Sequence, residues 1–204
     1  IVAAQFACNQ TSSNTRSNSP RPTEDVDGLP NYLDSTERDI SAASGGETVI
    51  GATSLRFFPG GVKSDLRVRL SRLDKAPAVT SEEAAVLGSA KSDIVQVEVI
   101  DPSTDRLVSS SDLAQTYQFT QKIDPSVDTT QLGLVVVTDP WTADEKKTLV
   151  PNDQLTVVAD ENLGMVVVAA DPYVTVRAKV TYAIMWLVNL TGDPSGVWNT
   201  SSAQ

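Results

Sequence analysis

The chain has 204 residues, a net charge of −10 at pH 7, no histidine and a single cysteine, Cys8. Histidine is the usual general base and the commonest metal ligand, so its absence excludes Ser-His-Asp and Cys-His catalysis and most zinc sites. An acidic surface of this kind would repel nucleic acid and anionic membranes, and no apolar run is long enough to cross a bilayer.

Residues 1–47 are predicted to form an extended N-terminal arm. Its first seven residues are mostly apolar, which makes Ile1, Val2 and Phe6 candidates for a subunit interface. The next stretch is rich in Ser, Asn, Thr and Pro, a composition that does not order itself, so a neighbouring subunit is expected to hold the arm. A short helix is expected near its end, where Asp34 is followed three residues later by Glu37.

Eight β-strands are expected after the arm, because short apolar runs with period-two alternation recur between turn signals. Residues 65–73 show the clearest alternation, and Pro59-Gly60-Gly61 marks the turn before them. The expected strands are residues 48–58, 65–73, 94–100, 117–123, 132–138, 155–159, 165–170 and 174–190. Capping boxes predict short helices at 80–88, closed by Gly88, and at 142–149, and Ser111 is expected to cap a single turn.

Five Asp-Pro dipeptides lie at or near the ends of these runs. Proline has no N–H for a β-ladder and disfavours a helical residue before it, while aspartate accepts a hydrogen bond from the backbone two residues on. Each dipeptide is therefore predicted to end a strand and begin a turn. They are Asp101-Pro102, Asp124-Pro125, Asp139-Pro140, Asp171-Pro172 and Asp193-Pro194.

The expected last strand, residues 174–190, is unusually long for a strand. One face is apolar throughout, and the other changes from polar to apolar at Ala183, Met185 and Leu187. The second half is therefore predicted to be covered on both faces. Either the domain itself or a partner subunit covers the second face, which makes Met185 and Leu187 candidate interface residues.

The predicted fold is all-β: an eight-stranded antiparallel β-sandwich of the jelly-roll type, with short helices in its loops. The domain boundaries would be 1–47 for the arm, 48–190 for the sandwich and 191–204 for a C-terminal tail. An immunoglobulin-like sandwich would have a similar number of strands, but the Cys…Trp…Cys core that is common there is missing.

Arg67, Arg69 and Arg72 lie in the most basic part of the chain. They are candidates for a face that contacts nucleic acid phosphates inside a shell. The alternative interpretation, which we favour, is a solvated face that pairs with acidic neighbours. Shell proteins usually bind nucleic acid through a strongly basic arm, and such an arm would have to precede Ile1.

Two acidic segments carry oxygen atoms that could bind calcium. Asp25-Val26-Asp27-Gly28 resembles the start of a calcium loop, but Pro30 stands where that loop needs glycine. Asp160, Glu161 and Asn162 cluster at an expected hairpin tip, where Ca²⁺ between subunits is the alternative to a solvated loop. No carboxylate pair, nucleophile elbow or phosphate loop stands out, so we predict neither an enzyme nor a resident cofactor.

The sequence favours a structural subunit that assembles with copies of itself. The leading hypothesis is the coat (capsid) protein of a small non-enveloped virus, located in the virion and without membrane insertion. The first alternative is an extracellular or cell-surface β-sandwich that builds a filament or sheath. The second is a carbohydrate-binding module, for which Trp141, Trp186 and Trp198 are the aromatic candidates.

Overall fold

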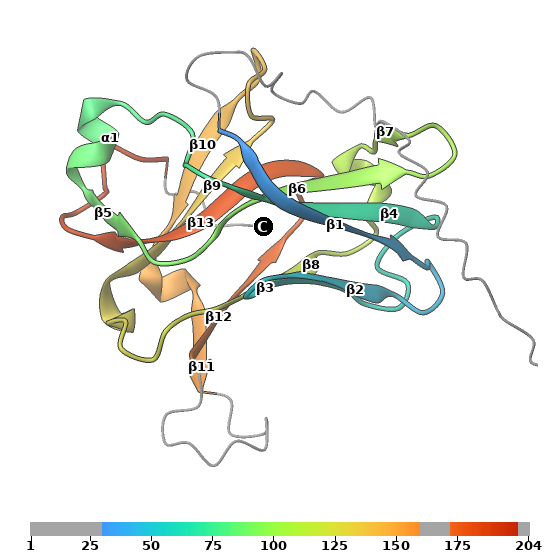
Figure 1. Cartoon of the computed structure of the whole chain (residues 1–204), viewed down its shortest axis with the longest axis horizontal. Coiled ribbons are helices and arrows are strands. Elements are labelled where there is room, and N and C mark those ends of the chain that lie inside the picture. Colours follow the sequence, from blue (N-terminus) through green and yellow to red (C-terminus); the bar gives the residue numbers. More distant parts are fainter. Residues whose placement is uncertain (1–29, 160–171, 200–204) are drawn as a thin grey trace, which may run out of the picture.

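The computed structural model describes residues 30–159 and 172–199 (Figure 1). The interface candidates Ile1, Val2 and Phe6 lie outside this part of the chain. So do the proposed hairpin tip at Asp160 and the strand expected at 165–170.

The described residues form thirteen strands, one short α-helix and three 3-10 turns. The strands are β1 (Tyr32–Ile40), β2 (Gly46–Ile50), β3 (Thr53–Phe57), β4 (Leu66–Leu73), β5 (Leu87–Ala90), β6 (Ile94–Asp101), β7 (Arg106–Leu107), β8 (Tyr117–Lys122), β9 (Leu132–Thr138), β10 (Lys146–Val150), β11 (Thr156–Ala159), β12 (Pro172–Ala178) and β13 (Tyr182–Leu190). The helix is α1 (Ser81–Ala85), and the turns are η1 (Ser110–Asp112), η2 (Thr129–Gln131) and η3 (Asn152–Gln154). No helix among these residues is long and apolar enough to cross a membrane.

Two antiparallel sheets make up the fold, which confirms the predicted all-β sandwich (Figure 1). The larger sheet has eight strands in the order β1-β4-β6-β13-β9-β10, with β5 beside β13 and β7 beside β6. The smaller sheet has five strands in the order β11-β12-β8-β3-β2. The two orders run in step when the larger sheet is read from β1 and the smaller sheet from β2. Strands at the same position in the two orders are β1 and β2, β4 and β3, β6 and β8, β13 and β12, and β9 and β11.

Two apolar clusters stabilise the sandwich. The main core lies between the sheets and includes Leu55, Val97 and Phe119. A second cluster lies on the outer face of the larger sheet, where Ile184 and Trp186 are buried with several other apolar residues. The segment around α1 and β5 and the described C-terminal residues supply part of this second cluster: Val86, Leu87 and Trp198. The outer face is thus apolar where the chain folds back over it.

Residues 174–190, expected to be one strand, form β12 in the smaller sheet and β13 in the larger. The prediction that the second half is covered on both faces is confirmed. Ile184 and Trp186 pack in the outer cluster, while Met185 and Leu187 pack between the sheets. Met185 and Leu187 are both 0% exposed within a single chain. Assigning them to a subunit interface was therefore wrong, because the second sheet of the same domain covers them.

Two predicted helices are strands. Asp34 and the residues after it belong to β1, which pairs with β4. β1 and the first two residues of β2 therefore lie in the segment expected to be an arm. Residues 146–150 form β10, paired with β9. Before β10, the Glu145 carboxylate accepts a hydrogen bond from the Trp141 backbone N–H, and the Thr142 hydroxyl donates to the Asp139 carbonyl. The polar groups of the expected cap close a turn instead of starting a helix.

Two further expectations are refined. Residues 48–58 contain a hairpin, β2–β3, whose turn includes Gly51 at φ +54°. The capping box of Thr80 and Glu83 is present at the start of α1, but the helix ends at Ala85, with Val86 as its C-cap, and Gly88 belongs to β5. The single turn η1 is capped by Ser109, with Ser111 inside it.

The Asp-Pro prediction is confirmed at three turns. The carboxylates of Asp101, Asp124 and Asp193 accept hydrogen bonds from the backbone N–H two residues on, at 2.8, 2.8 and 2.9 Å. The residue two positions on is serine in each turn. Bonds from its hydroxyl and backbone hold the pKa of each of the three carboxyl groups below the ordinary value.

Candidate functional site: the charged edge of the larger sheet

The arginines singled out in the sequence lie on β4, and each faces a carboxylate on the edge strand β1. The antiparallel register places Asp34 opposite Arg72, Glu37 opposite Arg69, and Asp39 opposite Arg67. Directly opposite side chains on one face of an antiparallel pair lie close enough for ion pairs to form. We call these six residues the charged ladder.

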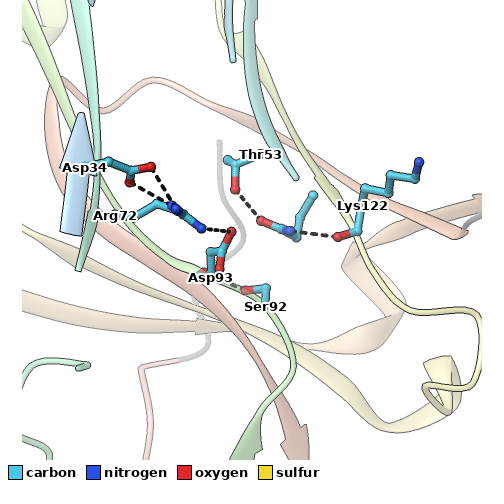
Figure 2. A network of polar contacts seen from close by, with 7 residues as sticks. Asp34, Thr53, Arg72, Ser92, Asp93 and Lys122 are labelled. Carbon is cyan, nitrogen blue, oxygen red and sulfur yellow. Dashed lines mark hydrogen bonds and ion pairs between the residues drawn. The ribbon is translucent and has the colours of Figure 1, made fainter. Parts of the chain in front are cut away.

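Arg72 is held by two carboxylates at one end of the charged ladder (Figure 2). Its Nε and Nη2 donate to the two oxygens of Asp34, both at 2.7 Å, a bidentate geometry that gives strong, directional pairing. Asp93, in the loop before β6, lies 3.7 Å from Nη1. The bonds from Arg72 hold the pKa of Asp34 below its ordinary value. This end of the charged ladder is therefore locked to the loop that leads into β6.

The β2–β3 turn and a second polar pair lie near this end of the charged ladder. A Cβ on Gly51 would come within 2.8 Å of an Asp93 carboxylate oxygen, so the Asp93 side chain would have to shift to admit it. Figure 2 also shows the Thr53 hydroxyl, which donates to the Gln121 side-chain carbonyl at 2.5 Å. The Gln121 amide donates in turn to the Lys122 carbonyl at 2.7 Å. The buried polar groups Thr53 and Gln121 thus satisfy each other, as buried polar groups generally must.

Arg69 is the buried centre of the charged ladder. It is 2% exposed and forms ion pairs with Glu37 on β1 and with Glu98 on β6. The Arg69 Nη1 to Glu98 Oε2 distance is 3.2 Å, and Glu98 is 0% exposed. The other Glu98 oxygen, Oε1, and the amide nitrogen of the neighbouring Gln96 have no hydrogen-bond partner among the described residues. Arg69 is therefore the main neutralising partner of a fully buried carboxylate.

Arg67, at the other end, donates from Nε to Asp39 Oδ1 at 3.0 Å, and this pair is largely exposed. All three candidate arginines are thus paired with acids, as the favoured interpretation predicted. The interpretation of Arg67, Arg69 and Arg72 as a nucleic-acid-facing row is not what the geometry supports. A phosphate would have to displace carboxylates already bound, and the side chain of Arg69 is inaccessible.

The acidic half of the charged ladder was missed in the sequence, although a signal was present. Asp34, Glu37 and Asp39 are spaced by three and then two residues, and Arg72, Arg69 and Arg67 repeat that spacing in reverse. Mirrored spacing of opposite charges is what an antiparallel pair requires, because opposite residues then keep a constant sum of residue numbers.

The smaller sheet carries a depression of about 380 Å³. Gln118, Gln154, Thr175 and Arg177 contribute polar groups to its lining. The Arg177 guanidinium lies 5.5 Å from the ring centroid of Phe58. This depression is shallow and polar, and none of its lining residues is aromatic.

The tryptophans considered for carbohydrate binding lie elsewhere. Trp186 and Trp198 are buried in the outer cluster, and the ring of Trp141 packs 6.4 Å from that of Tyr182. The Trp198 indole also donates to the Glu83 carbonyl at 3.2 Å. These rings pack the fold and do not form an open platform for a sugar.

No group of three or more Asp, Glu or Cys residues suited to a metal ion occurs in residues 30–159 and 172–199. A comparison of the chain with protein-family models finds no match, and neither does a comparison with curated proteins.

Proposed function

We propose that the protein is a structural subunit that assembles with copies of itself, and that the assembly is the coat of a small non-enveloped virus. The order of the strands is the observation that carries the proposal. β13 lies between β6 and β9 in one sheet, and β12 lies between β8 and β11 in the other. The last two strands of the described chain are thus inserted between ribbons formed earlier in the sequence.

This insertion is the feature that favours a jelly roll over other sandwiches. In a Greek key, a strand returns by a long connection to lie beside a strand formed earlier, and a jelly roll repeats the pattern across two sheets. Viral coats are built from this fold, as are lectins and cupins. The strand order therefore supports a coat subunit without excluding other uses, because a fold alone does not decide function.

The free edges of the sheets add support for assembly. β1 ends the larger sheet and β2 ends the smaller one. Each carries an exposed large apolar side chain, Leu33 at 61% and Val49 at 54% exposure. Edge strands present unpaired backbone groups that readily join another chain. A subunit that is embedded in a shell or a filament would cover such edges.

The charged side chains join neighbouring strands, which also supports a structural role. Arg69 and Glu98, the buried ion pair, join β4 to β6, and the exposed pairs join β4 to β1. These groups hold strands together and leave no open cleft between acid and base. Strands tied together by ion pairs, and free strand edges, are features that support the proposal of a coat subunit.

Sedimentation velocity and negative-stain electron microscopy of the purified 204-residue chain test the proposal. Closed isometric particles are expected, and helical filaments would favour the alternative of a surface filament or sheath. A folded monomer of 21.7 kDa at all concentrations up to about 1 mM, with native circular dichroism and a cooperative thermal transition, would refute self-assembly.

A further inference from the structure

The outer edge of β1 is the longest free strand edge in the described structure. β1 spans nine residues and pairs with β4 on one side only. Most of its residues are exposed, and the exceptions are Tyr32, Thr36 and Ile40. From Asp34 to Ile40 its pairing with β4 is regular. Between Tyr32 and Asp34 the register shifts. The free side of the regular stretch from Asp34 to Ile40 is a template for one more strand.

We propose that this edge pairs with β1 of a second copy of the chain, antiparallel and about a twofold axis through Thr36. The inference rests on the proposed function and names the surface and the partner through which the subunits join. Full overlap of two strands running from 32 to 40 places Thr36 opposite Thr36. The larger sheet would then run without interruption from β10 of one copy to β10 of the other.

The charges on β1 favour this register over its neighbours. With full overlap, Asp34 of each copy lies opposite Arg38 of the other, Glu37 faces Ser35, and Asp39 faces Leu33. Two opposite-charge pairs form and no like charges meet, which is the favourable arrangement for cross-strand pairs. A slip by one residue would place Asp34 opposite Glu37 in one direction and opposite Asp39 in the other. Either slip would bring two pairs of carboxylates face to face.

The groups that this pairing requires are accessible in the single chain. Arg38 is exposed and forms no ion pair with the described residues, unlike the three arginines of β4. The Asp34 side chain keeps 46% of its surface exposed while it binds Arg72. A carboxylate has lone pairs for several donors, so Asp34 can accept Arg38 of the second copy without releasing Arg72.

Disulfide trapping tests the register directly. In the full chain with Cys8→Ser, Thr36→Cys places two thiols opposite each other, and Cα atoms of opposite residues are about 4.5 or 5.5 Å apart, within disulfide range. Leu33→Cys is the matched control, because this exposed position alters no charge. In the proposed register its two copies lie six positions apart, roughly 20 Å along the strand. Mild oxidation should yield a covalent dimer for Thr36→Cys and little or none for Leu33→Cys.

A second arm tests the charges. Adding Arg38→Glu to Thr36→Cys should lower the yield of dimer at least fivefold, because glutamate would then face Asp34 twice. Lys146→Glu, at an exposed position on β10, makes the same change of charge away from β1 and should leave the yield unchanged.

Each other outcome has a distinct meaning. Equal cross-linking of Thr36→Cys and Leu33→Cys would overturn the proposed register. Failure of Thr36→Cys to cross-link in a sample that sediments as particles would overturn the pairing and leave the proposed function standing. That result is also expected if residues 1–29 of the same chain cover the edge. Failure to cross-link in a sample that is monomeric throughout would overturn both proposals.

Discussion

Replacing Arg69 by methionine should destabilise the protein strongly, because Glu98 would lose its cation. Glu98 is 0% exposed, and Arg69 is its only ion-pair partner among the described residues. Breaking a buried pair by removing one partner costs about 3–5 kcal/mol, since the remaining charge stays desolvated. This is a large part of the roughly 5–15 kcal/mol that stabilises a typical domain. For a chain of this size it corresponds to a fall in Tm of roughly 6–20 °C.

Urea unfolding followed by tryptophan fluorescence measures the loss, and Arg67→Met is the matched control. Arg67 is 29% exposed and its partner Asp39 is 75% exposed, so solvent screens the pair and its loss should cost less than about 1 kcal/mol. The double variant Arg69→Met/Glu98→Leu should recover most of the lost stability, because apolar replacement of a buried ion pair is often neutral. Equal effects of Arg69→Met and Arg67→Met, or no recovery in the double variant, would refute the reasoning.

Three further predictions concern the outer cluster, an Asp-Pro turn and a pair of glycines. Trp186→Ala should lower the free energy of unfolding by about 3–5 kcal/mol in urea titrations, since the ring is 3% exposed; a loss below 1 kcal/mol would mean that the outer cluster is not a core. The pKa of Asp101 is lowered in the folded state by bonds from Ser103. The contribution of Asp101 to folding stability is therefore fully present above its unfolded pKa of about 4, and it is lost as the pH falls through the lower folded pKa. Stability measured between pH 5 and 2 should therefore fall less steeply in Asp101→Asn, and an unchanged slope would contradict the assignment. Gly45→Ala should destabilise more than Gly60→Ala in thermal unfolding: both residues have positive φ, near +70°, but a Cβ at Gly45 would meet the Phe57 carbonyl oxygen at 2.3 Å, whereas at Gly60 it would meet nothing within 4 Å. Equal losses would show that the turn at Gly45 adjusts freely.

Local chemistry was enough to predict many of the elements. The strands at 65–73, 94–100, 117–123 and 132–138 appear within a residue or so of the expected bounds. Alternation works there because each of these strands has a face in the core between the sheets. The Asp-Pro turns and the cap of α1 were also predictable, since a side chain and a backbone group two or three residues away form the whole motif.

The same local rules failed where distant residues competed. Asp34 and Glu37 have the spacing of a helix cap, yet they bind Arg72 and Arg69 on β4. The turn at Thr142 leads into β10 because β9 offers a ladder to residues 146–150. In both places, pairing with a neighbouring strand outweighs the smaller preference of a single helical turn.

Local patterns of residues suffice to predict an all-β chain, the positions of most of its strands and turns, and the two apolar faces of the strand that ends at Leu190. The folded chain alone reveals which surfaces cover those faces, where the run from 174 to 190 changes sheet, and which acids pair with the arginines. The physical reason is that alternation and turn chemistry act between residues a few positions apart. The burial of Met185 and Trp186 and the neutralisation of Arg69 depend on segments brought together only by folding.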